Sequence, residues 1–88
     1  MSINNHIRNY YEQLVAEEII RKTKTGTEVD YLADVACVAL NHLPPRYIRY
    51  EVDMAFYTSP NELSETLKMV EKAVSDAIAF VDKHQRQD

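Results

Sequence analysis

The chain has 88 residues, of which 45% are hydrophobic and 27% charged, with a single glycine and a net charge of −4. This composition is typical of one small helical domain, and it excludes a disordered segment or a turn-rich β protein. The charge excludes a broad surface for duplex DNA, and no apolar run reaches the roughly 18 residues that span a bilayer. A polar start unlike a signal peptide and a lone cysteine lead us to expect a cytoplasmic protein without membrane contact.

Apolar residues at three- and four-residue spacing predict an amphipathic helix over about residues 4–21. The stretch that ends it includes Lys22 and Lys24, with no acid between Ile19 and Thr27. These basic residues have two readings: Lys22 complements the end of the helix, or both lysines help to hold a compact anionic ligand. The apolar positions are Ile3, Ile7, Tyr10, Tyr11, Leu14, Val15 and Ile19.

A second helix is predicted over about residues 28–42, with Thr27 as its cap. It is apolar over nearly its full circumference, and Asp34 and Asn41 are among its few polar members. A helix of this kind is buried on more than one side, so we expect a partner chain to cover part of it. We also expect Cys37, in the middle of this helix, to be a buried and inert thiol.

A double proline, Pro44-Pro45, stops this helix and is followed at once by Arg46 and Tyr47. Two readings stay open. The prolines either shape a corner in which the tyrosine packs, or they present a planar cation beside an aromatic ring, a pair suited to phosphate or nucleobase binding.

The spacing of apolar residues changes over about residues 46–57, where apolar and polar residues alternate from Ile48 to Phe56. Alternation predicts a half-buried strand, yet the sequence offers no second strand to pair with it. The segment is therefore an arm over the helices, a strand paired with its copy in a dimer, or a short helical turn near residues 53–57.

The third helix is predicted over about residues 60–84. Ser59 is placed to cap it, Pro60 to occupy its first position and Glu62 to complete a capping box. An apolar seam in four-three alternation then predicts packing within a bundle or a dimer. The seam consists of Leu63, Leu67, Val70, Val74, Ala77 and Val81.

These elements predict a single all-α domain over residues 1–88, with three helices, a proline corner and a short extended segment, assembled as a helical homodimer. The sequence has no nucleophile–histidine–acid set and no glycine-rich phosphate loop, and its histidines are far apart. We therefore predict neither an enzyme nor a metal or cofactor site.

Residues 34–48, with the element Leu43-Pro44-Pro45-Arg46-Tyr47, resemble the signature of the late competence development ComFB family. The resemblance extends upstream to Asn9-Tyr10-Tyr11-Glu12 and downstream to residues 53–57. It implies a small, mostly helical, dimeric regulatory domain, and some members of the family are receptors for bacterial cyclic dinucleotides. Members that resemble the zinc-binding type carry additional cysteines that this chain lacks, so zinc is not expected.

A cyclic dinucleotide requires cations for two phosphates, flat surfaces for two bases and polar groups for the base edges. By residue chemistry, the arginines and lysines suit the phosphates, a tyrosine suits stacking, and the aspartate and asparagine suit the base edges. The candidate site residues are Lys22, Lys24, Asp34, Asn41, Arg46, Tyr47 and Arg49, with Tyr50 as an alternative stacking ring.

The rival reading is a structural homodimeric module that contacts a partner protein and takes no small ligand. Arg46 would then order the corner through ion pairs, for example with Glu51 or Asp53. The identity of the dinucleotide and of the downstream protein stays open in both readings.

Overall fold

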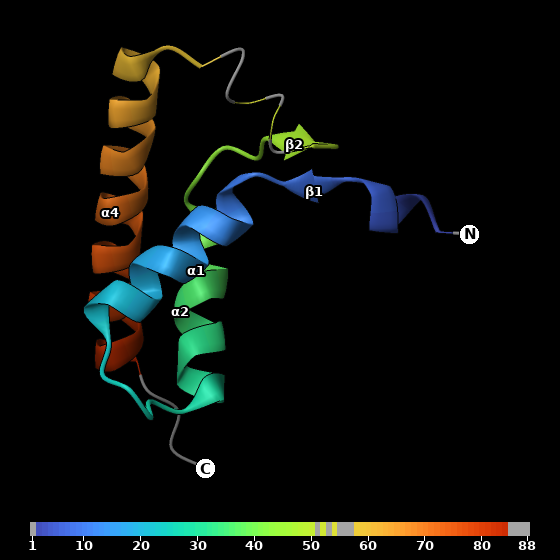
Figure 1. Ribbon diagram of the computed structural model, residues 1–88. Coiled ribbons are helices and arrows are strands. Elements are labelled where there is room, and N and C mark those ends of the chain that lie inside the picture. Colours follow the sequence, from blue (N-terminus) through green and yellow to red (C-terminus); the bar gives the residue numbers. More distant parts are fainter. Residues whose placement is uncertain (1, 51, 53, 55–57, 85–88) are drawn as a thin grey trace.

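A computed structural model describes residues 2–50, 52, 54 and 58–84 of the chain (Figure 1). Its helices are α1 (Tyr11–Lys22), α2 (Val29–Asn41) and α4 (Pro60–Lys83), and a short 3-10 helix, η1 (Ile3–His6), precedes them. Two short strands, β1 (Arg8–Asn9) and β2 (Tyr47–Ile48), pair antiparallel. The predicted class, a mainly helical fold with a small extended part, is therefore confirmed.

Helices α2 and α4 lie side by side and run in opposite directions, and α1 crosses them (Figure 1). The hydroxyl of Tyr31, near the start of α2, donates a 2.6 Å hydrogen bond to Asp82 near the end of α4. The three helices enclose one core, which consists of Tyr11, Val15, Ile19, Val35, Ala39, Leu43, Val70, Ala73, Val74, Ala77 and Val81.

Helix α4 begins where the sequence predicts. Ser59 precedes it, and its Oγ accepts a 3.1 Å hydrogen bond from the backbone N–H of Glu62. The predicted seam enters the core only in its later part, because Leu63 and Leu67 are exposed whereas the four seam residues from Val70 onward are buried. The first turns of α4 thus extend past the three-helix core and leave an apolar surface there.

Helix α1 begins at Tyr11, so the predicted start near residue 4 is wrong. Asn9 stops the helix from extending backward: its Oδ1 accepts from the backbone N–H of Tyr11 (3.2 Å), and its own N–H donates to Glu12 Oε2 (3.3 Å). This is a capping arrangement that fixes a helix start. Ile3 and Ile7 consequently lie outside the core and are exposed.

Helix α2 has the predicted bounds but not the predicted cap. Thr27 Oγ1 donates to the carbonyl of Lys24 (2.6 Å), and Glu28 occupies the capping position. The turn before it needs Gly26, whose φ of 90° lies in the left-handed region that favours glycine. The prediction of a buried Cys37 is wrong, since this thiol is exposed on the outer face of α2.

In the described part of the segment 46–57, residues 47–48 form β2, which pairs within the same chain with β1, a strand that the apolar periodicity assigns to the first helix. Val52 and Met54 have helical backbone conformation, which disagrees with a strand there and agrees, at Met54, with the alternative of a short helical turn near residues 53–57. Residues 51, 53 and 55–57, on which the rest of that prediction falls, lie outside the described residues.

Candidate ligand-binding site

The strands β1 and β2 form a two-stranded ribbon that projects from the helices (Figure 1). In its register Arg8 lies opposite Ile48, and Asn9 lies opposite Tyr47. The backbone N–H of Tyr10 also donates to the carbonyl of Arg46 at 2.6 Å. The ribbon therefore joins the residues before α1 to the segment that follows the double proline.

Asn9 fixes the backbone at the corner. Besides capping α1, its Oδ1 accepts a 3.1 Å hydrogen bond from the backbone N–H of Arg46. Pro44 and Pro45 are exposed and carry the chain from the buried Leu43 to this point. The corner is thus held by main-chain and Asn9 contacts, and these contacts do not use the guanidinium of Arg46.

Two arginines and two tyrosines just before, on and just after β2 are exposed. Tyr47 is 65% exposed and Tyr50 is 56% exposed, and Arg46 and Arg49 are exposed as well. The reading in which Tyr47 packs into the corner is therefore wrong, and the four side chains line a surface open to solvent.

Arg49 and Tyr50 form a pair. The guanidinium carbon of Arg49 lies 5.1 Å from the centre of the Tyr50 ring, and Nη2 donates a 3.2 Å hydrogen bond to the Tyr50 hydroxyl. Contact with the ring orders the guanidinium, which has five N–H donors, so donors remain for an anion. A planar cation already ordered on a ring loses less freedom when it binds a phosphate.

A groove of about 300 Å³ lies beside this pair, where η1 and β1 approach the residues after β2. Its lining is mainly polar and includes the cationic side chains of Arg8 and Arg49. The residues around it are Asn5, His6, Ile7, Arg8, Arg49 and Tyr50.

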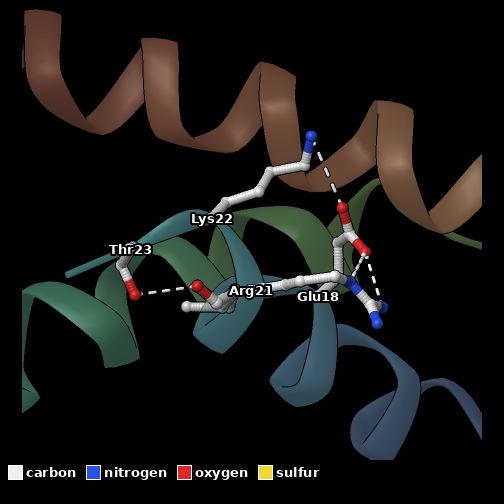
Figure 2. A network of polar contacts seen from close by, with 5 residues as sticks. Glu18, Arg21, Lys22 and Thr23 are labelled. Carbon is white, nitrogen blue, oxygen red and sulfur yellow. Dashed lines mark hydrogen bonds and ion pairs between the residues drawn. The ribbon is translucent and has the colours of Figure 1, made fainter. Parts of the chain in front are cut away.

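The predicted lysines lie elsewhere, at the end of α1 far from the ribbon (Figure 1). Figure 2 shows that Lys22 pairs with Glu18, its Nζ lying 3.4 Å from Oε2, while Arg21 donates to Oε1 of the same carboxylate at 2.8 and 3.0 Å. Within one chain, the structure does not bring Lys22 or Lys24 together with Arg46 and Arg49.

Asp34 and Asn41 lie two turns apart on α2, and both are exposed. Asn41 Nδ2 donates a long 3.7 Å contact to the Sγ of Cys37, which lies between them on the same side of the helix. These polar groups therefore belong to the outer face of α2, whereas the arginines belong to the ribbon. The expected ion pairs of Arg46 with Glu51 or Asp53 involve residues outside the described part of the chain.

Sequence reasoning missed the contribution of Arg8 and Asn9. A signal for it was present, because Asn9 followed three residues later by Glu12 is the pattern of a helix start. This pattern places the start of the helix after Asn9 and so separates β1 from α1. The apolar spacing alone joins them in one helix. In residues 2–50, 52, 54 and 58–84, no group of three or more histidine, cysteine or acidic residues could hold a metal ion.

The class of protein is a small, mainly helical domain from which a two-stranded ribbon projects. The family model of the late competence development protein ComFB matches residues 8–85, nearly the whole chain. The chain therefore belongs to the ComFB family. A comparison with curated proteins finds no match. None of the helices in the described part of the chain is long and apolar enough to cross a membrane.

Proposed function

We propose that this ComFB-family protein is a non-catalytic regulatory domain that binds a cyclic dinucleotide as a homodimer in the cytoplasm. The observation that carries the proposal is the polar groove lined by Arg49 and Tyr50, with Arg46 and Tyr47 exposed nearby in the sequence. Arginines suit phosphodiester oxygens, and tyrosine rings suit bases. Occupancy of the site would be relayed to a downstream protein.

A homodimer is supported by the outer face of α2. Val29 is 76% exposed, Ala33 and Cys37 are exposed, and Ala36 and Leu40 are half-buried. The three exposed residues lie on one side of α2, away from Val35 and Ala39, whereas Ala36 and Leu40 pack against the core. The small side chains allow a second helix to approach closely. A two-fold dimer also matches a ligand with two equivalent halves. In a dimer, Asp34 and Asn41 would lie at or beside the interface.

Calorimetric titration with cyclic di-GMP and, separately, cyclic di-AMP tests the proposal. We expect micromolar or tighter binding of at least one of them. Arg49→Ala should weaken this binding about tenfold or more, as expected for loss of a charge-assisted bond. Lys68→Ala, which removes an exposed cation from α4, should leave binding unchanged.

If the folded wild type binds neither ligand, the proposal is contradicted and the protein-interaction module is favoured. Binding that is equally strong in Arg49→Ala and the wild type would instead contradict the placement of the phosphates at the ribbon. Circular dichroism of each variant establishes that its helices are intact.

A further inference from the structure

A groove of about 510 Å³ lies between α2 and α4, which run side by side (Figure 1). Its lining includes the buried residues Leu43, Ala73 and Ala77 and two large apolar side chains that solvent reaches. Met69 is 41% exposed and Phe80 is 51% exposed. Large apolar side chains exposed together around a groove mark a surface that contacts another molecule.

The exposed residues with which α4 lines this groove form one stripe. Met69, Lys72, Asp76 and Phe80 follow one another at three- and four-residue spacing, so they lie on one side of the helix. Within the chain, Lys72 Nζ lies 2.8 Å from Asp76 Oδ2, and both side chains are exposed. The stripe thus reads apolar, basic, acidic, apolar. Two copies of it laid antiparallel bring apolar ends together and place opposite charges face to face.

We propose that a second copy of this chain docks on the groove, with its α4 antiparallel to α4 of the first copy about a two-fold axis near residues 74–75. The inference rests on the homodimer of the proposed function and names its interface. Lys72 lies opposite Asp76 of the partner subunit, and Met69 lies opposite Phe80 of the partner subunit. A two-fold interface uses the same patch on both chains, so each contact is made twice.

The groove is continuous with the outer face of α2. Val38 lines the groove, and Cys37 and Asn41, its neighbours along the helix, are exposed on that face. The outer face of α2 offers mainly small side chains, whereas a stable interface buries about 800 Å² on each chain. The groove and the stripe on α4 enlarge this surface and supply the large apolar side chains that it lacks.

Phe80 is suited to anchor the contact. Its ring stacks on the ring of His84, with 4.3 Å between the centroids and an angle of 22° between the planes. Nδ1 of His84 also lies 2.9 Å from the carbonyl oxygen of Phe80. An aromatic side chain that is already ordered loses less freedom on association, and such residues commonly dominate interfaces.

Two charge-reversal variants test this inference. Lys72→Asp makes both charges of the stripe acidic, and Asp76→Lys makes both basic. Because each variant then faces like charges twice, we expect at least tenfold weaker self-association than for the wild type in sedimentation equilibrium. An equimolar mixture of the two should recover wild-type association, since an acidic stripe then faces a basic one. Glu71→Lys, on the side of α4 that faces α1, should dimerise as the wild type does.

The outcomes separate this interface from the homodimer itself. If the wild type is a dimer and both variants dimerise equally tightly, pairing through α4 is overturned while the homodimer stands. If both variants dissociate and their mixture stays dissociated, the opposite charges do not face each other and the antiparallel pairing is overturned. If the wild type is a monomer, the homodimer and the interface both fail. Circular dichroism establishes that each variant keeps its helices.

Discussion

At the scale of single residues, one side chain links two distant parts of the chain. Asn9 Oδ1 accepts from the backbone N–H of Tyr11 at the start of α1 and from that of Arg46 after the double proline. The backbone of Arg46 is therefore fixed while its side chain stays exposed. A positioned backbone with a free cation is the arrangement that an anion-binding arginine needs.

Tyr31 gives the protein a pH dependence in the alkaline range. Its hydrogen bond to the Asp82 carboxylate, with burial and the negative charge of Asp82, raises the pKa of Tyr31 from 10.0 to about 12. Because the folded state holds the proton more tightly than the unfolded state, this contribution to stability is complete below about pH 10. It is lost as the pH rises through about 12.

Tyr31→Phe should therefore lower the free energy of unfolding at pH 7 by about 0.5–1 kcal/mol. The difference in the free energy of unfolding between the variant and the wild type should shrink above pH 10. In an absorbance titration, the ionisation near pH 12 that Tyr31 gives in the wild type should be missing from the variant. Urea unfolding and absorbance titration of the tyrosinates measure these two effects. Tyr47→Phe, which removes an exposed hydroxyl, is the control. Equal stability of Tyr31→Phe and the wild type at pH 7 would contradict the account.

Glu18 is buried, with 8% of its surface exposed. It accepts from Arg21 and lies beside Lys22 (Figure 2). Glu18→Gln keeps its shape but removes the charge that both cations face. We expect a loss of about 1 kcal/mol, kept small because Arg21 is mostly exposed to solvent. Urea midpoints measure it, with Glu65→Gln as the control. A midpoint for Glu18→Gln that matches the wild type would show that the ion pairs do not stabilise the fold.

At the scale of elements, the sequence predicts α2 and α4 well because local signals mark their ends. A serine and a proline start α4, and a double proline follows α2. The ribbon could not be predicted this way. Each strand has two residues, and the pairing of Arg8 with Ile48 joins segments far apart in the sequence. Residue chemistry after the double proline pointed to Arg46, Tyr47 and Arg49. No local signal pointed to Arg8, because the groove that it lines with Arg49 depends on the pairing of the strands.

The start of α4 depends on one side chain. Ser59→Ala removes the Oγ that accepts from the backbone N–H of Glu62, and we expect a loss of about 1 kcal/mol in the free energy of unfolding. Ser64→Ala, within the exposed part of the same helix, removes a hydroxyl without a capping role and should cost less. Urea unfolding compares the two. Equal effects would mean that Ser59 does not determine where α4 begins.

At the scale of the whole molecule, the proposed homodimer can be tested at the outer face of α2. Sedimentation equilibrium at micromolar concentration should give twice the mass of the chain. Ala33→Arg should shift the protein to the monomer, because it places a charge on the proposed interface, whereas Ala16→Arg on α1 should not. A short bismaleimide should link two chains through Cys37, the single cysteine of the protein. A wild type that sediments as a monomer would contradict the proposed homodimer.

Binding at the ribbon can be observed by titrating the isotopically labelled protein with cyclic di-GMP and following its backbone amide NMR signals. It reports both whether the ligand binds and where. We expect saturable chemical-shift changes in the amides of residues 5–10 and 46–50, with smaller changes on the first turns of α1. An unchanged spectrum at millimolar ligand, or shifts confined to the end of α4 far from the ribbon, would contradict it.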